Sequence, residues 1–231
     1  MRELPEDPRR VYLTDDPAED TPRAAKHRLV REVKRIVRRT ALLDVADTDP
    51  AEVNRLAADA KGLADSLEEL PSLLAFGGMA VAPLADAALL ERSPVSGRSN
   101  PVAPPLHLEM HEGVTTGWAV YPDEYEGPPG CLHGGWVAAA FDDLMGFAQM
   151  ASGKAGYTGT PTVRMVRPTP LNRRIDYEAH LDHVDGRKIW CKATARDGEE
   201  LLAEAEILFI APRAWPPGMT HPEWPEPDQR R

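Results

Sequence analysis

A chain of 231 residues has room for one large domain, or for one domain with an extension. Hydrophobic residues make up 42% of the chain and charged residues 28%, and the net charge of −10 argues against general binding to phosphate backbones. Its two cysteines, Cys131 and Cys191, follow no metal-binding or redox spacing. No apolar run reaches the ~18 residues of a membrane helix, and the first residues do not resemble a signal peptide. We therefore expect reduced thiols, a cytoplasmic location and no membrane span.

The first hundred residues predict a tail, a helical hairpin and an irregular connection. Residues 1–22 are rich in Pro, Asp and Arg, a composition typical of a loosely attached segment. Residues 24–43 follow a helical period, in which basic positions surround one apolar stripe: Leu29, Val30, Val33, Ile36 and Val37. Residues 50–70 predict a second helix with an apolar face and an acidic remainder. Two amphipathic helices of opposite charge predict a helical hairpin over 23–72, and residues 73–103 predict an irregular crossing segment.

The basic face of the first helix also permits contact with DNA or RNA. A two-helix element whose second helix is acidic more often packs against protein, as an extension or as a cap on a dimer. We therefore expect no nucleic-acid partner.

Residues 104–212 predict a sheet wrapped around a single apolar helix. Side chains alternate between apolar and polar in six strand candidates: 105–111, 114–121, 161–167, 173–184, 188–196 and 201–211. Asp185-Gly186 and Asp197-Gly198 are typical of tight hairpin turns. The apolar segment 134–152 lies between the second and third strands, and a helix that is apolar on all sides needs a sheet around it. The sequence therefore predicts an α+β fold, followed by a tail over 213–231.

A glycine-rich segment, Gly127 to Gly135, leads directly into the apolar helix. Glycines at a helix start leave the first backbone N–H groups open to a ligand, and the helix dipole adds partial positive charge there. His133-Gly134-Gly135 could therefore hold a developing oxyanion. The alternative is an ordinary tight turn, in which the glycines serve only the backbone.

Two carboxylates, Asp142 and Asp143, interrupt the apolar helix. A carboxylate among apolar side chains costs free energy unless it is paired or used in chemistry, although both could also lie on a narrow exposed edge. Threonines precede the next strand, and Thr158 or Thr160 could orient a water molecule. Threonine is also an ordinary strand residue, so this signal has a purely structural alternative.

No other pattern in the sequence points to catalysis or metal binding. His180 and His183 are three residues apart, so we expect them on opposite faces of a strand, where they cannot share a metal ion. The chain has no GxSxG, Walker or GxGxxG motif, which argues against serine hydrolases, kinases and dinucleotide enzymes. We expect no metal site.

Taken together, these segments resemble a known family. The Gly127-Pro128-Pro129-Gly130 loop, His133-Gly134-Gly135, an Asp nine positions after that His, a following Thr and the strand end Arg167-Pro168 are similar to the PaaI-type branch of the hotdog acyl-CoA thioesterases. Within that branch they resemble the thioesterase-superfamily member 4 type. The resemblance covers residues of about 104–211. It implies a hotdog fold, a curved antiparallel sheet of about six strands around a long central helix, here with an N-terminal helical-hairpin extension. It also implies a homodimer or a dimer of dimers.

The resemblance assigns roles to individual residues. It implies a catalytic carboxylate, a backbone oxyanion donor, a motif histidine and a water-holding hydroxyl, which fall on Asp142, Gly134, His133 and Thr158 respectively. Gly135 is expected beside them as a substrate-binding residue. Two departures from the family pattern matter: Gly127 stands where some members carry Asn, and Pro161 could shift the strand so that Thr160 holds the water instead.

The implied reaction is hydrolysis of an acyl-CoA thioester to the free acid and CoA, with no cofactor beyond the CoA of the substrate. Asp142 would act as general base on water or as direct nucleophile, and His133 would shape the loop. The cations that would bind the CoA phosphates are expected around the turn between two strands, at Arg167, Arg173 and Arg174. The alternative is that these arginines form an ordinary solvated hairpin end. The alternative function is a non-catalytic acyl-CoA sensor, although a sensor does not need Asp142. A hotdog dehydratase would need a hydratase-type motif, which we do not find.

The spacing between Gly134 and Asp142 predicts a site shared by two chains. Eight residues of helix separate them, which at ~1.5 Å per residue is about 12 Å along the axis. A thioester carbonyl lies ~3 Å from its oxyanion donor, and the attacking group must lie within ~3.5 Å of the carbon. One unbroken helix cannot satisfy both distances, so we expect a two-fold dimer with antiparallel central helices.

Overall fold

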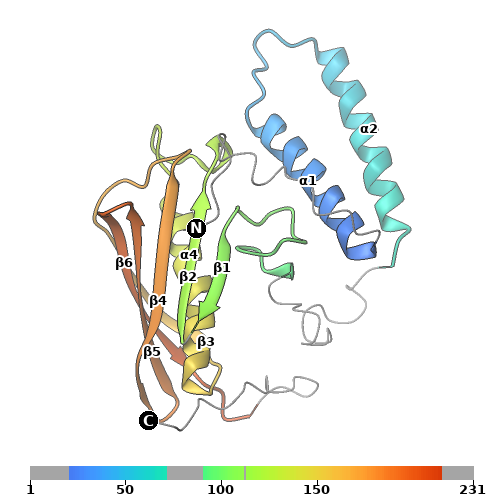
Figure 1. Cartoon of the computed structure of the whole chain (residues 1–231). Coiled ribbons are helices and arrows are strands. Elements are labelled where there is room, and N and C mark those ends of the chain that lie inside the picture. The colour runs from blue at the N-terminus through green and yellow to red at the C-terminus, as the bar shows by residue number, and fades with distance from the viewer. Residues whose placement is uncertain (1–20, 72–90, 112, 215–231) are drawn as a thin grey trace.

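A curved, six-stranded antiparallel sheet with one long helix against its inner face forms the main body of the protein (Figure 1). The computed structural model describes residues 21–71, 91–111 and 113–214. The strands are β1 (His107–His111), β2 (Val114–Val120), β3 (Tyr157–Met165), β4 (Arg174–Asp185), β5 (Lys188–Asp197) and β6 (Glu200–Ile210), in the spatial order β1-β2-β4-β5-β6-β3. The predicted α+β hotdog fold is therefore confirmed. Almost all of both predicted tails, and residues 73–90 of the predicted crossing segment, lie outside the described residues.

The long helix, α4 (Gly134–Ala148), supplies the centre of the core and continues into the short 3-10 helix η6 (Gln149–Ser152). Seven of its side chains are buried: Val137, Ala140, Phe141, Leu144, Met145, Phe147 and Ala148. All of them except Phe147 belong to the same apolar cluster as inward-facing strand residues such as Ile175, Cys191 and Ile207. Since full burial of one large aliphatic or aromatic side chain contributes about 1.5–3 kcal/mol, this contact between helix and sheet is the main stabilising feature of the fold.

Strand β3 begins at Tyr157, four residues before the start predicted at Pro161. Pro161 instead lies inside the strand, opposite Ile207 of β6. A strand tolerates proline at the edge of a sheet, where no neighbour needs its missing N–H, and β3 pairs only with β6 among the described strands. The register shifts between Thr158 and Thr160, so the two threonines occupy different environments.

A second bulge, between Leu181 and His183 in β4, overturns one prediction. The extra residue places His180 and His183 on the same outer face, opposite Lys192 and Trp190 of β5, whereas a regular strand would have separated them. In the part of the chain that the structure describes, no group of His, Cys, Asp and Glu side chains is arranged to hold a metal ion.

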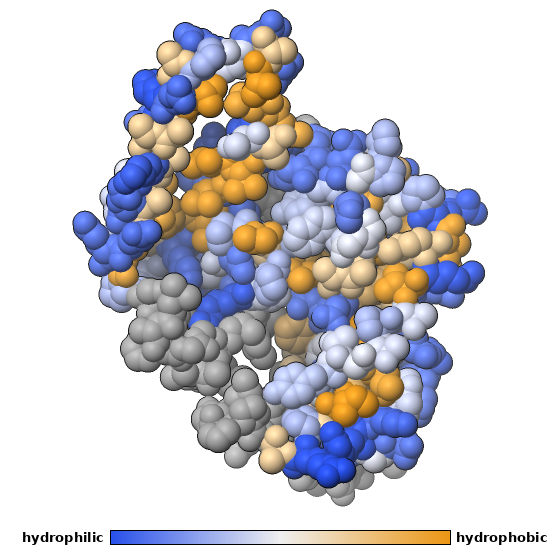
Figure 2. Space-filling view, turned by 180° about the vertical axis from the view of Figure 1, so that it is seen from behind, coloured by the Kyte–Doolittle hydropathy of each residue, from blue (hydrophilic) through white to orange (hydrophobic). Residues whose placement is uncertain are grey.

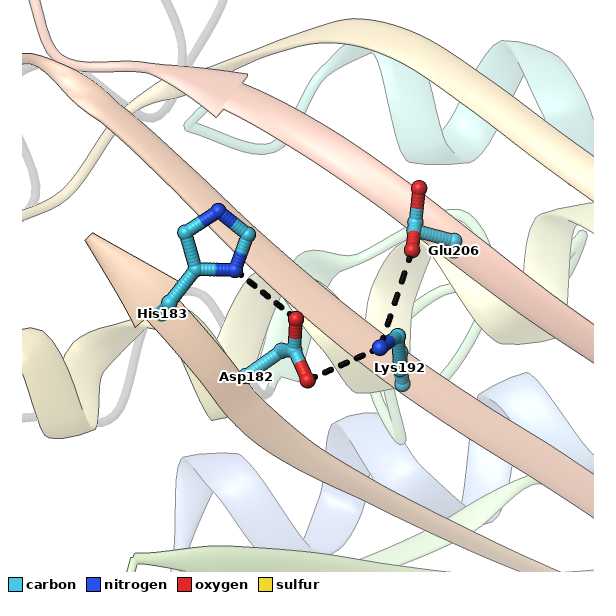
Figure 3. A network of polar contacts seen from close by, with 4 residues as sticks. All are labelled: Asp182, His183, Lys192 and Glu206. Atoms are coloured by element: carbon cyan, nitrogen blue, oxygen red, sulfur yellow. Dashed lines mark hydrogen bonds and ion pairs between the residues drawn. The ribbon is translucent and has the colours of Figure 1, made fainter. Parts of the chain in front are cut away.

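On this outer face His183 takes part in a polar network (Figure 3). Asp182 lies 2.8 Å from Nδ1 of His183 and 2.9 Å from Nζ of Lys192, which in turn lies 3.9 Å from Glu206. The His183 ring also stacks on Trp190, with 4.2 Å between the ring centroids. These contacts occupy the side chains that a metal site would need.

Two helices precede the sheet, α1 (Pro22–Ala41) and α2 (Pro50–Glu68), and lie on the β1 side of it (Figure 1). Thr21 and Asp49 cap them through side-chain hydrogen bonds, and each helix has Pro in its first turn. The predicted helices are present, but the predicted apolar stripe of α1 is buried only in part: Val30 is buried, whereas Ile36 and Val37 remain 46% and 51% exposed. No residue of α2 is buried. Neither helix is long and apolar enough to cross a membrane, and the same holds for α4.

Polar contacts explain why the second half of the apolar stripe stays outside. The buried His27 places Nε2 2.7 Å from Oε2 of Glu91, and the Ser99 hydroxyl donates to the same oxygen at 2.6 Å. Near the other end of the helix, Arg38 lies 3.3 Å from Asp123 and 3.5 Å from Glu124. Asp123 and Glu124 belong to the 3-10 helix η5 (Asp123–Tyr125), between β2 and α4. The polar flank of α1 therefore faces the sheet domain, and Ile36 and Val37 stay outside.

Glu91→Gln should loosen α1 without unfolding the sheet. Burial raises the pKa of Glu91, but hydrogen bonds from Ser99 and His27 outweigh it, so the pKa lies below its ordinary value. The stabilisation by this carboxylate is therefore present above the ordinary glutamate pKa and is lost as the pH falls through the lowered one. Amide-exchange protection factors over residues 22–41 should drop in that acidic range for the natural protein, and at neutral pH for the variant.

Glu32→Gln is the matched control for this experiment. Glu32 lies on the same helix but pairs only with the exposed Arg35, and an exposed pair contributes little. Its removal should leave the protection factors unchanged. If Glu91→Gln left them unchanged as well, the polar anchor would not hold the helix.

Candidate active site

The glycine-rich loop before α4 is held against the segment that follows β3. The Leu132 N–H donates to the Thr169 carbonyl at 2.8 Å, and the Leu171 N–H donates to the Gly130 carbonyl at 3.1 Å. Gly130 adopts a left-handed φ of 72°, which favours glycine at this turn. A Cβ on Gly127 would lie 2.7 Å from the His133 Cα, so the absence of a side chain lets the loop close. Hydrogen bonds and close packing therefore fix the backbone of the glycine-rich loop.

His133 is the N-cap of α4. Its Nδ1 accepts a hydrogen bond from the Gly135 N–H at 3.0 Å, which satisfies one of the free donors of the first helical turn. This contact fits the predicted loop-shaping role of His133 and engages the amide of Gly135, a predicted substrate-binding residue. The Gly134 N–H is exposed and has no acceptor among the described residues, so it is the open donor at the positive end of the helix.

Asp142 and Thr158 meet across the space between α4 and β3. The Thr158 hydroxyl donates to Oδ1 of Asp142 at 2.8 Å, and both residues are exposed. Oδ2 of Asp142 has no partner within the described part of the chain. Thr160, the alternative for the same role, lies beyond the bulge and does not reach Asp142. The two residues that the sequence singled out are thus brought into direct contact.

The turn between α4 and β3 is fixed by Gln149, a residue that the sequence analysis did not identify. Its Oε1 accepts from the Gly156 N–H at 2.8 Å, and its Nε2 donates to the Gly156 carbonyl at 3.2 Å. A Cβ on Gly156 would lie 2.8 Å from the backbone of Ile210, so only glycine fits there. Gln149 and Gly156 set the start of β3 and therefore the approach of Thr158 to Asp142. The sequence offered one signal for Gln149, which is a polar residue directly after an apolar helix.

Asp143 has a different environment from its neighbour. It accepts hydrogen bonds from the hydroxyls of Ser93, at 3.1 Å, and Ser96, which come from the crossing segment before β1. Burial and the adjacent Asp142 raise its pKa, and the two serine hydrogen bonds only partly offset this. Asp143 therefore fastens the crossing segment to α4. No motif in the sequence pointed to Ser93 and Ser96, although their Ser-x-x-Ser spacing is visible there.

The three arginines predicted for phosphate contact do not form one cluster. Arg167 and Arg173 pair with Glu200 and Asp197, at 2.9 Å and 2.8 Å, and so flank the β5–β6 turn. Arg174 pairs with Asp176 at 2.7 Å, and its guanidinium lies 5.0 Å from the Trp118 ring centroid, toward β2. Each has an acidic partner, which is the arrangement expected of a solvated strand end. Arg167 and Glu200 are both mostly exposed, and an exposed pair of this kind is weak enough to exchange for a phosphate. Arg173 is also exposed, but the side chain of its partner Asp197 is only 11% exposed.

The architecture and the site together define a hotdog protein with a carboxylate and an open helix N-terminus beside one edge of its sheet. No family model matches the chain. A thioesterase superfamily protein of known crystal structure is 30% identical and superposes with a TM-score of 0.71, over 86% of this chain and 98% of its own. The chain therefore belongs to the thioesterase superfamily, as the sequence motif predicted.

Curated relatives match a shorter region. Acyl-coenzyme A thioesterase THEM4 of Xenopus laevis is 32% identical over 87 residues, which are 37% of this chain and 39% of that protein. The Bos taurus protein of the same name is 34% identical over 87 residues, which are 37% of this chain and 35% of its own. The match thus spans little more than a third of these relatives.

Asp143→Ala should destabilise the protein, whereas Asp143→Asn should not. The alanine variant leaves the buried Ser93 hydroxyl and the partly buried Ser96 hydroxyl without their acceptor, and losing a hydrogen bond to a charged group costs about 1.5–3 kcal/mol. The asparagine keeps an acceptor and removes a carboxylate whose raised pKa makes its charged form unfavourable. Stability of the natural protein should also fall as the pH rises through that pKa, and the asparagine variant should lack this dependence. Denaturant unfolding across pH measures both, and equal loss in the two variants would contradict the assignment.

Proposed function

We propose that the chain is an acyl-CoA thioesterase, which hydrolyses an acyl-CoA thioester to the free acid and CoA. The observation that carries the proposal is the contact between Asp142 and Thr158, on the exposed side of a helix whose first N–H, at Gly134, is unpaired among the described residues. A carboxylate in contact with a hydroxyl can hold and activate water, and an open helix N-terminus can stabilise an oxyanion. The names of the curated relatives point to the same reaction.

In the proposed mechanism the two oxygens of the Asp142 carboxylate have separate tasks. Oδ1 accepts the Thr158 hydrogen bond, which fixes the carboxylate, and the free Oδ2 takes a proton from water as that water attacks the thioester carbon. The C–S bond then breaks, and Asp142 returns the proton to the departing CoA sulfur. Direct attack by Oδ2 on the carbon would use the same geometry and pass through an acyl-enzyme. The Gly134 N–H would stabilise the negative charge that develops on the carbonyl oxygen. Arg167 and Arg173 are the candidates for phosphate contact, and no cofactor beyond the CoA of the substrate is needed.

We further propose that two chains build each site, in a homodimer. Helix α4 runs unbroken from Gly134 to Ala148, so Gly134 and Asp142 remain about 12 Å apart along its axis at ~1.5 Å per residue. Both groups must lie within about 3.5 Å of one thioester group, which a single chain cannot achieve. Antiparallel packing of two α4 helices around a two-fold axis brings Gly134 of one chain to Asp142 of the other, twice.

Asp142→Asn should abolish most turnover while the fold persists. A neutral amide cannot take a proton from water, and loss of a general base costs about 10²–10⁴-fold in rate. Thiol release from a panel of acyl-CoAs of different chain lengths measures the effect. Asp143→Asn is the matched control at the adjacent position and should cost far less, because Asp143 contacts serines rather than the exposed site. Equal losses would refute the choice between the two carboxylates.

The same assay decides between an enzyme and the alternative, a non-catalytic acyl-CoA sensor. A sensor would bind acyl-CoA and release no thiol from any member of the panel. Binding of labelled acyl-CoA by a natural protein that never releases thiol would therefore replace the proposed function with the sensor.

Mixing two inactive variants should restore activity if the site is shared. Gly134→Pro removes the open N–H at the first position of α4, where proline fits, and His133 before it already has the extended conformation that proline requires. Co-refolding this variant with Asp142→Asn gives mixed dimers in which one of the two sites retains both groups. Those dimers should regain up to half of the natural activity. Mixed dimers that form, as shown by two different affinity tags, but stay inactive would rule out the shared site.

A further inference from the structure

We propose that the N-terminal helices bind a second copy of this chain through an apolar seam on α2. The seam residues recur at alternating intervals of three and four positions, the spacing at which helices pack side by side: Val53, Leu56, Ala60, Leu63, Leu67 and Leu70. The four leucines among them are 52%, 39%, 37% and 58% exposed. The first five seam residues form one continuous face of α2, which buries no residue, and Leu70 lies in the turn just after the helix ends at Glu68.

The remaining positions of α2 show that only this one face needs a partner. Ion pairs join Arg55 to Asp59 at 3.0 Å, beside the seam, and Lys61 to Asp65 at 2.6 Å, on the side of the helix away from it. On the face opposite the seam, a Cβ built on Gly62 would find nothing within 4 Å. An isolated helix of this length is marginal in water, so α2 gains most of its stability when the seam is covered.

The seam borders a hollow between the two helices. Figure 2 shows apolar surface beside a hollow between the helices. Ile36 and Val37 of α1 are half-exposed, as the seam leucines of α2 are. Apolar surface on both sides of a hollow fits a third helix better than it fits a flat surface, because such a helix is then covered on two sides.

Charge complementarity identifies α2 of a second copy as the occupant. Helix α1 is strongly basic and has Glu32 as its only acidic residue, whereas the acidic residues of α2 outnumber its basic ones: Glu52, Asp59, Asp65 and Glu68 against Arg55 and Lys61. Insertion of a second α2 therefore places an acidic helix beside a basic one. Rotation about a two-fold axis repeats the contact, so that each α2 lies between α1 and α2 of the other copy. The charge complementarity belongs to the contact with α1, and the contact between the two α2 helices is made by their apolar seams. The buried seam would be about 26 Å long at ~1.5 Å per residue.

This contact is separate from the dimer proposed for catalysis. The N-terminal helices lie at the β1 end of the sheet, whereas Asp142 and Thr158 lie at the β3 end (Figure 1). A chain with one two-fold contact at each end can close into a dimer of dimers. The competing occupant of the seam is the apolar stretch 72–90 of the same chain, which lies outside the described residues.

Ala60→Glu and Ala58→Glu form a matched pair that tests the seam. Both positions are exposed on α2 and receive the same charge, but Ala60 lies within the seam and Ala58 on the opposite face. The mass of the assembly, measured by light scattering at several protein concentrations, should halve with Ala60→Glu and stay unchanged with Ala58→Glu. Thiol release per chain should be the same in both variants and in the natural protein.

An unchanged mass in Ala60→Glu would overturn the proposal, and it would do so whether residues 72–90 or solvent cover the seam. A halved mass in both variants would overturn it as well, because the effect would then not depend on the seam. The mass is read without reference to catalysis, so absence of thioesterase activity would leave this test intact.

Discussion

Burial of the central helix is the interaction on which the rest of the structure depends. Helix α4 carries apolar side chains on nearly every side, and such a helix is stable only where a sheet covers it. The covering is incomplete along one strip, which faces β3 and carries the exposed residues Gly134, Gly135 and Asp142. The candidate site is therefore located where the wrapping of the helix ends. Its polar groups stay hydrated without interrupting the apolar contact that stabilises the fold.

The neighbouring aspartates show how position on this helix decides chemistry. Successive residues of an α-helix point about 100° apart, so Asp142 faces Thr158 while Asp143 faces Ser93 and Ser96. Both oxygens of Asp143 accept hydrogen bonds from serine hydroxyls, so neither oxygen is free to take a proton from water. Asp142 keeps one oxygen free at the surface. The environment, rather than the residue type, separates a structural carboxylate from a candidate catalytic one.

Periodicity in the sequence was enough to predict the six strands, the central helix and the two N-terminal helices. It failed where one residue changes the register: the bulge in β4 reversed the expected placement of His183 relative to His180, and the bulge in β3 separates Thr158 from Thr160. It also failed where contacts join distant segments. The serines that hold Asp143 lie almost fifty positions away. The polar contacts that hold α1 are likewise made with later segments of the chain, so the apolar stripe alone does not predict how this helix docks. No local pattern contains such information.

The exposed edge of β3 connects the fold with the proposed site. A long open edge strand offers unpaired N–H and C=O groups to any other strand, and natural proteins cover or interrupt such edges. Strand β3 spans Tyr157–Met165, has one partner among the described strands, and is interrupted only by Pro161 and the bulge beside Thr158. This same strand borders both ends of the strip on α4, since Thr158 contacts Asp142 and the position of a Cβ on Gly134 lies 3.6 Å from the Met165 methyl group. A second chain that covered this edge would therefore also enclose the strip that holds Gly134 and Asp142. A single two-fold contact at β3 would therefore both protect the edge strand and complete the site.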